Sequence, residues 1–220
     1  MKTSTPDTSR DRARTLMRPR WKGANSIQLA HQLNERCVEL FSELAANATI
    51  IDTLPPALRE NRDLWFELSV DARHRLAALP FVIVDVRFRD EQWWRALGKL
   101  PSPADVREEG LPAERCEDLL LETLMFAWQV AREDSHVAQM IFAMTRPVVR
   151  VIAELAIREI RTLATEHTAC LRIRWSDNAL FWRELLERVR ADDASALEDS
   201  MLHAKLLFCG DLIGDAFGDT

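Results

Sequence analysis

Glycine is missing from most of the second half of this chain. Of 220 residues only six are glycine, at positions 23, 98, 110, 210, 214 and 218, so none occurs from 111 to 209. Glycine supplies the positive φ angles of tight hairpin turns and forms the loops that cradle phosphates in nucleotide-binding folds. Its absence over so long a run argues against those structures and favours long helices joined by short links.

The stretch from 112 to 163 is predicted to form the core. Between 119 and 131 only Glu122, Thr123 and Gln129 interrupt a run of apolar residues. A helix that is apolar on nearly every side must be covered by other elements on more than one side. This first helix of the core is therefore expected to lie at the centre of the fold.

Two signals divide the rest of the core stretch. Asp134 and Ser135 predict the end of one helix and the cap of the next. The pair Arg146-Pro147 predicts a break, because proline removes a helical hydrogen bond and disfavours helix in the preceding residue. A third helix is expected from 147 to about 166, mostly aliphatic with one polar stripe: Arg150, Glu154, Arg158 and Arg161.

The first helix is predicted to begin at Ser26 and to reach about Asn47. Apolar residues recur along it at alternating spacings of three and four, which indicates a seam against another helix. We leave open whether this seam packs inside the monomer or forms a homodimer interface. A helix-turn-helix centred on Asn34 is rejected because the seam continues through that residue. The seam residues are Ala30, Leu33, Cys37, Leu40 and Leu44.

Caps and proline residues predict further helices on both sides of the core. Pro55-Pro56 opens a helix that contains Leu58, Leu64, Trp65 and Leu68, and Ser69 caps a helix over 70 to 79. Asp90 caps the next helix. Ser176 and Asp177 begin a helix after the core, and a last helix carries Ala196, Leu197, Met201, Ala204, Leu207 and Phe208.

Two segments have the alternating pattern of strands. Residues 81 to 88 alternate Val82, Val84 and Val86 with polar positions, and residues 170 to 175 alternate apolar residues with two arginines. The two segments either pair as a small ribbon, in which Asp85 would neutralise an arginine, or are helical, because short apolar runs are ambiguous.

These features predict an all-α fold. We expect a single-domain helical bundle of about seven to nine helices, with or without one short two-stranded β-ribbon. The expected organisation is a disordered basic arm over 1–24, a helical domain over 25–209 and a flexible acidic tail over 210–220.

Charge is distributed unevenly along the chain. Residues 1 to 22 hold seven Lys or Arg residues and two Asp, a net charge of +5, so the rest carries −11 of the overall −6. The arm is a candidate contact for nucleic acid or another polyanion, with Trp21 available to stack on a base. The alternative is a solubilising tail or a strap across the acidic body. The candidate residues of the arm are Arg12, Arg14, Arg18, Arg20 and Trp21.

No motif of a catalytic or cofactor site occurs in the sequence. Serine-hydrolase elbows, dinucleotide fingerprints and phosphate loops are all missing, and the histidines never supply more than two ligands at metal spacing. We therefore predict no cofactor and no metal. The four cysteines stand far apart, which is typical of reduced, buried thiols, although Arg36 and Arg115 directly precede Cys37 and Cys116.

No apolar run approaches the roughly 18 residues needed to span a bilayer, and the N-terminus lacks the apolar segment of a secretory signal. We therefore expect no membrane span and a cytoplasmic location.

Two groups of apolar side chains are candidate binding sites. Trp93 and Trp94 point about 100° apart on a helix. Either one of them reaches the surface and anchors a partner, or both cap the core. The second group would line a pocket among the central helices: Met125, Trp128, Met140, Phe142 and Met144.

The sequence favours a non-catalytic regulatory or adaptor protein that binds another protein through helical and tryptophan-containing surfaces. The first alternative is a helical small-molecule sensor or enzyme that uses the pocket among the central helices. The second alternative is a nucleic-acid-associated regulator that uses the basic N-terminal arm.

Overall fold

The computed structural model describes residues 23–97 and 110–191. Residues 1–22 of the predicted basic arm, the acidic tail and the last helix therefore lie outside the described residues, whereas residues 23 and 24 belong to the first helix. The described part contains ten α-helices and one two-stranded ribbon, which confirms the all-α prediction and the ribbon. The α-helices are α1 (Gly23–Ala46), α2 (Pro56–Arg59), α3 (Arg62–Phe66), α4 (Val70–Ala77), α5 (Glu91–Arg95), α6 (Ala113–Glu133), α7 (Ser135–Phe142), α8 (Arg146–Glu154), α9 (Ile157–Glu166) and α10 (Ala179–Ala191). The strands are β1 (Val84–Asp85) and β2 (Arg172–Ile173), and the short 3₁₀-helices are η1 (Ile51–Thr53) and η3 (Thr168–Cys170).

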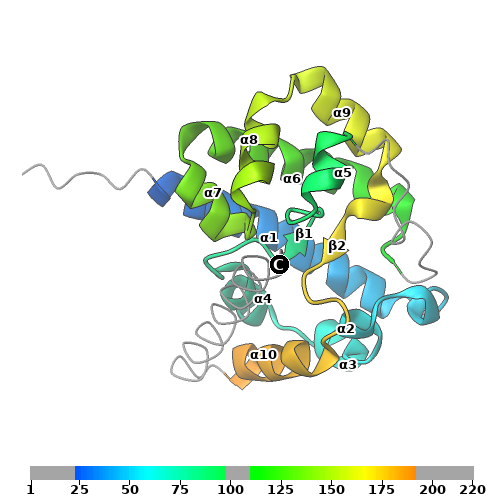
Figure 1. Ribbon diagram of the computed structural model, residues 1–220. Coiled ribbons are helices and arrows are strands. Elements are labelled where there is room, and N and C mark those ends of the chain that lie inside the picture. The colour runs from blue at the N-terminus through cyan, green and yellow to red at the C-terminus, as the bar shows by residue number, and fades with distance from the viewer. Residues whose placement is uncertain (1–22, 98–109, 192–220) are drawn as a thin grey trace, which may run out of the picture.

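Helix α1 runs through the middle of the molecule, between two groups of helices (Figure 1). It packs against α2, α3 and α4 on one side and against α6 and α7 on the other. Helix α10 lies with α2, α3 and α4, although it follows the central helices in the sequence. The group formed by α2, α3, α4 and α10 therefore contains residues from both halves of the chain.

The apolar seam of α1 is buried inside the monomer. All five seam residues are at most 8% exposed, because α3, α4 and α6 cover them. This confirms monomer packing as the explanation of the seam, and the helix continues through Asn34 as expected. The predicted start was wrong: α1 begins at Gly23, and Ser26 is a buried residue within it.

Helix α6 is the centre of the second group, as its apolar composition predicted. It packs against α1, α7, α8, α9 and η3. Most of its charged residues lie near its two ends, and its middle is buried or half-buried, with Glu122 as the charged exception. The residues of α6 that contribute to the core are Cys116, Leu119, Leu120, Thr123, Leu124, Phe126, Ala127, Val130 and Ala131.

Two predicted helices are each split in two, which raises the number of helices above the predicted seven to nine. Between α2 and α3, the buried Asn61 side chain donates to the carbonyls of Ala57 (3.1 Å) and Ala179 (2.8 Å). Between α8 and α9, Leu155 is extended and its carbonyl accepts from the Trp128 indole at 3.0 Å. In each case a side chain donates a hydrogen bond to a backbone carbonyl near the break.

Most predicted helix caps are present. Ser69 and Asp90 each accept a backbone N–H at the start of α4 and α5. Asp134 ends α6 and also caps α7, so Ser135 is the first helical residue rather than the cap. Asn178 accepts from Phe181 N at 3.0 Å and caps α10, a role predicted for the residues just before it.

The ribbon joins distant parts of the chain. β1 and β2 are antiparallel, with Val84 opposite Ile173 and Asp85 opposite Arg172. Only two residues of each predicted segment are paired as strand. The flanking residues are held by other bonds, such as Arg174 N to Ile83 O at 2.8 Å.

Asn34 fixes the loop between α4 and β1 to the middle of α1. It is fully buried, its Nδ2 donates to Phe81 O (2.8 Å) and to Ala77 O (3.3 Å), and its Oδ1 accepts from Ile83 N (3.0 Å). A buried amide with its donors and acceptor satisfied specifies one position for the loop.

We expect Asn34→Ala to lower the free energy of unfolding by about 3 kcal/mol, because it leaves buried backbone groups without partners. Chemical denaturation measures this change. The matched control is Asn47→Ala at an exposed residue, which is expected to cost less than about 0.5 kcal/mol. Equal losses in the two variants would contradict the assignment.

Candidate interaction surface

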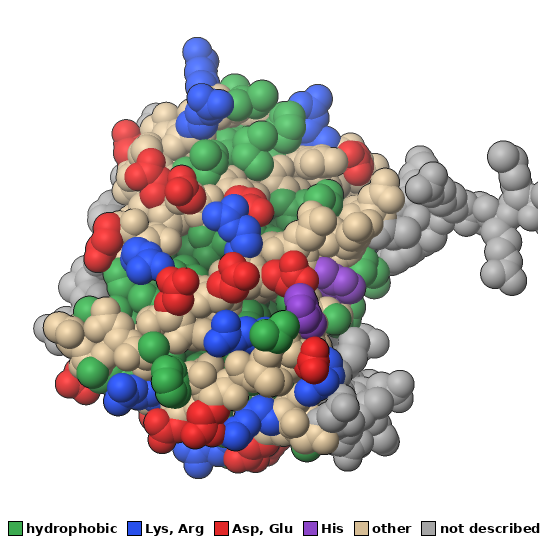
Figure 2. All heavy atoms as spheres, turned by 180° about the vertical axis from the view of Figure 1, so that it is seen from behind, with side chains coloured by type: hydrophobic (Ala, Val, Ile, Leu, Met, Phe, Trp, Pro, Cys, Tyr) green, Lys and Arg blue, Asp and Glu red, His purple; other side chains and the backbone are tan. Residues whose placement is uncertain are grey.

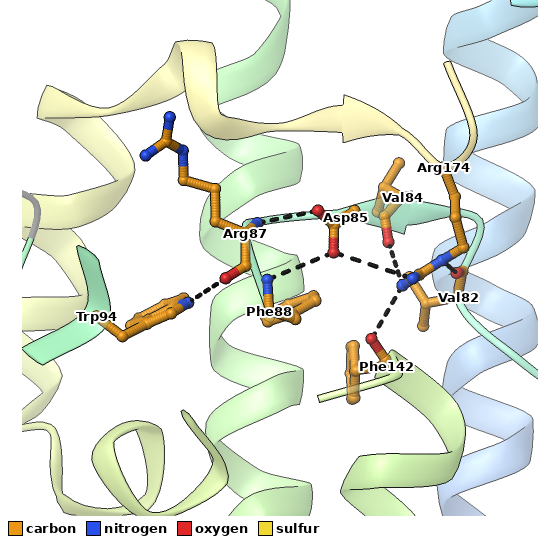
Figure 3. Close-up of polar contacts among 8 residues, drawn as sticks. All are labelled: Val82, Val84, Asp85, Arg87, Phe88, Trp94, Phe142 and Arg174. Atoms are coloured by element: carbon orange, nitrogen blue, oxygen red, sulfur yellow. Dashed lines mark hydrogen bonds and ion pairs between the residues drawn. The ribbon is translucent and has the colours of Figure 1, made fainter. Parts of the chain in front are cut away.

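A buried arginine holds the ribbon to the central helices (Figure 3). Arg174 is 6% exposed, and its guanidinium donates to the carbonyls of Val82, Val84 and Phe142, each at 3.0 Å. Its Nη1 also lies 3.9 Å from Asp85 Oδ1, which confirms the expected neutralisation. The three carbonyls come from the β1 segment and from the end of α7, so this arginine has a structural role.

The turn after β1 is fixed by the same cluster. Asp85 accepts from Arg87 N (3.1 Å) and Phe88 N (3.4 Å), and Arg87 adopts a positive φ of 49°. The Trp94 indole donates to Arg87 O at 2.9 Å. The polar groups drawn in Figure 3 therefore act on one another and stabilise the fold.

Trp93 and Trp94 are both buried. They are 3% and 0% exposed, so the prediction that one indole reaches the surface was wrong and the alternative, that both belong to the core, is what the structure has. Trp93 lies between the Arg87 guanidinium, 5.4 Å from its ring, and the His167 ring at 5.5 Å. Helix α5 is short enough for the neighbouring segments to cover both indoles.

The five residues of the predicted pocket differ in burial. Phe142 and Met144 are fully buried, Met140 is 67% exposed on α7, and Met125 and Trp128 are half-buried. A recess, which the sequence did not indicate, lies elsewhere. Its lining residues are Pro55, Gly110, Leu111, Arg172, Ile173, Ser176 and Asp177.

The described thiols are buried. Cys37, Cys116 and Cys170 are free and buried, as expected. Burial raises the pKa of Cys116 to about 12 and raises the pKa of Cys37 further, so the preceding arginines do not activate either thiol. Within residues 23–97 and 110–191, no group of three His, Cys, Asp or Glu residues is placed to hold a metal ion.

Most arginines of the described part are bound to other groups of the protein. Arg36 pairs with Glu122 and Arg115 with Glu43, so both pairs connect α1 to α6. Arg190 bonds Glu67 at 2.8 Å between α10 and the end of α3. Carboxylates and arginines accordingly alternate over much of the face in Figure 2.

Helices α8 and α9 differ from the rest in this respect. Each has exposed arginines on the side turned away from its buried residues, and no ion-pair or hydrogen-bond partner of these side chains occurs within the described part of the chain. Helix α9 runs along the upper edge of the molecule in Figure 1, with α8 below it. We call these four exposed residues of α8 and α9 the arginine face: Arg146, Arg150, Arg158 and Arg161.

The arginine face includes three of the four residues of the predicted polar stripe. The fourth, Glu154, is exposed on the last turn of α8. Glu159 is occupied within the fold, because its Oε2 accepts from Ala156 N at 2.7 Å. The candidate residues of the N-terminal arm, Arg12, Arg14, Arg18, Arg20 and Trp21, lie outside the described residues.

None of the helices in the described part is long and apolar enough to cross a bilayer.

We expect Arg174→Met to lower the free energy of unfolding by about 3 kcal/mol or more, because three buried carbonyls lose their donor. The control is Arg95→Met, which removes an exposed pair with Glu91 and is expected to cost about 0.5 kcal/mol or less. Denaturant titration of both variants provides the comparison. A similar cost for the two would show that the buried contacts do not stabilise the fold.

We expect Cys37 and Cys116 to resist iodoacetamide at pH 8 in the native protein. With a pKa of about 12, only about one Cys116 thiol in ten thousand is ionised at that pH, and burial also blocks access. Peptide-level mass spectrometry distinguishes these residues from Cys209. The same protein in urea should react fully, whereas equally fast alkylation of the native protein would contradict the burial of these thiols.

Residues 112–208 match the family described as flagellar transcriptional activator (FlhD). The matched segment begins just before α6 and includes α6 to α10, hence also the arginine face. No curated protein and no solved structure matches the chain. The second half of the chain is thus similar in sequence to a family of transcriptional activators.

Proposed function

We propose that this protein is a non-catalytic regulator of transcription that acts by binding other macromolecules, with a protein partner as its main contact. The observation that carries the proposal is the match of residues 112–208, which contain the central helix α6, to a family described as transcriptional activators. A cytoplasmic location, expected from the sequence, fits this function.

The surface of the described helices supports a binding role. Three large apolar side chains on the group formed by α2, α3, α4 and α10 are mostly exposed: Phe66 (63%), Val70 (68%) and Leu180 (64%). Exposed apolar residues of this size are common at sites of protein contact. The small-molecule alternative has less support, since Met140 is 67% exposed whereas Phe142 and Met144 are buried.

Nucleic-acid association is the second candidate function. It is favoured by the arginine face, which lies within the segment that matches the activator family. The N-terminal arm stays a candidate for the same contact.

Deletion of the gene from its native cells should change the abundance of a defined set of transcripts, measured by RNA sequencing. Wild type and Arg95→Met should restore those transcripts, whereas Arg174→Met should fail to the extent that its fold is lost. Native mass spectrometry of the full-length protein, isolated gently from those cells, should show the added mass of a second polypeptide. Unchanged transcripts together with a bare protein would overturn the proposal.

A further inference from the structure

We infer that the basic N-terminal arm, residues 1–22, folds back over the junction between α3 and α4 and covers Phe66 and Val70. The inference goes beyond the proposed function and does not rest on it. Its starting point is the exposure of these two apolar side chains, 63% for Phe66 and 68% for Val70. Among the exposed large hydrophobic residues identified in the described part, these two lie closest together in the sequence.

The chain around Phe66 and Val70 is acidic. Residues 60–71 hold four Asp or Glu residues and one Arg, a net charge of −3. Arg190 of α10 binds Glu67 at 2.8 Å, whereas the other three carboxylates have no ion-pair or hydrogen-bond partner among the described residues. We call this stretch the acidic corner; its exposed acidic residues are Glu60, Asp63, Glu67 and Asp71.

The side chains of the acidic corner lie close to one another. Asp63, Phe66 and Glu67 are three or four residues apart, and Glu67 N donates to Asp63 O at 3.0 Å, so they are neighbours at the end of α3. Val70 begins α4 four residues after Phe66, a distance of at most roughly 14 Å even for a fully extended chain. One segment that crosses the corner can therefore contact both apolar side chains and the carboxylates beside them.

The N-terminal arm has the complementary composition. It carries a net charge of +5, and its apolar pair Leu16 and Met17 stands between Arg14 and Arg18. Apolar burial and attraction between opposite charges would thus act at the same place when the arm meets the acidic corner. The start of the C-terminal segment fits this corner less well, because residues 192–199 contain four acidic residues and no Lys or Arg.

The arm is long enough to reach the corner from the start of α1. The Glu35 carboxylate, twelve residues along α1 from Gly23, lies 3.3 Å from Nδ1 of His74 on α4. Val70 is one helical turn from His74, so the path along the two helix axes is at most roughly 24 Å. An extended chain spans about 3.5 Å per residue, so 22 residues exceed this distance more than twice. Because the arm is tethered, weak exposed contacts are sufficient to hold it.

Docking of the arm would regulate access to this surface. Phe66 and Val70 are two of the three exposed side chains that support protein binding under the proposed function. A partner that uses them must displace the arm, so its apparent affinity falls by the fraction of molecules in which the arm is undocked.

The test places a nitroxide label in the arm of the full-length protein by Ser9→Cys, with Cys209→Ser so that only buried native thiols remain. Amide signals are then recorded by NMR with and without reduction of the nitroxide. We expect strong broadening of the signals of residues 63–71 at low salt, and loss of most of it at about 1 M salt, where the Debye length is about 3 Å. Signals of α9, in the other group of helices, should stay unchanged.

Paired variants separate the carboxylates of the corner from net charge. D63N/D71N should reduce the broadening of the corner signals by about twofold or more, because two exposed ion pairs with the arm are lost. E114Q/D118N removes the same charge from exposed carboxylates of α6 and should leave the broadening as it is in the wild type.

A second pair of variants tests the apolar contact. F66Q/V70Q should also reduce the broadening, because the arm loses the apolar surface that it covers. L180Q changes a side chain of matched exposure, 64%, on α10 and should leave the broadening unchanged. All these substitutions replace exposed side chains, so the melting temperatures should stay near that of the wild type.

Four outcomes would overturn the inference. The first is a label at residue 9 that leaves the corner signals sharp at every salt concentration. The second is an equal loss of broadening in D63N/D71N and E114Q/D118N. The third is broadening of the corner by a label on the native Cys209 and not by one at residue 9, which would make the C-terminal segment the occupant. The fourth is broadening that passes only between a labelled and an unlabelled molecule, which would make a second copy the occupant. In each case the transcript and partner measurements still decide the proposed function separately.

Discussion

The contact between the Arg174 guanidinium and three backbone carbonyls is the constraint on which the two groups of helices depend. Burying a charged group is costly unless hydrogen bonds satisfy it, and here the carbonyls of Val82, Val84 and Phe142 do so. The backbone of the same residue accepts from the Trp182 indole at 2.8 Å. One residue therefore joins β1, the end of α7 and α10.

The helices of the segment that is similar to transcriptional activators also depend on contacts with the rest of the chain. Within the described residues, this segment supplies α6 to α9, which pack against α1 and α5, and α10, which packs against α2, α3 and α4. Helix α1 covers α6, and Asn34 positions the segment from which β1 begins. The arginine face consequently depends on the N-terminal half for the position of the helix that supports it.

Local chemistry made much of the fold predictable from the sequence. The all-α class followed from missing glycines, the central position of α6 from its composition, and several helix starts from caps such as Ser69 and Asp90. The splits at Asn61 and Leu155 were not predictable, because their partners, Ala179 and Trp128, are distant in sequence. The burial of Trp93 likewise depends on His167, a residue of another segment.

The arginine face illustrates how much of a candidate site can be predicted from the sequence alone. Arg150, Arg158 and Arg161 were visible as a stripe, but a charged stripe is most often a solvated surface that its own protein neutralises. What distinguishes these arginines is where the carboxylates lie: Glu122 and Glu43 are committed to α1–α6 pairs, and Glu159 to the start of α9. The absence of a partner within residues 23–97 and 110–191 is a property of the assembled fold.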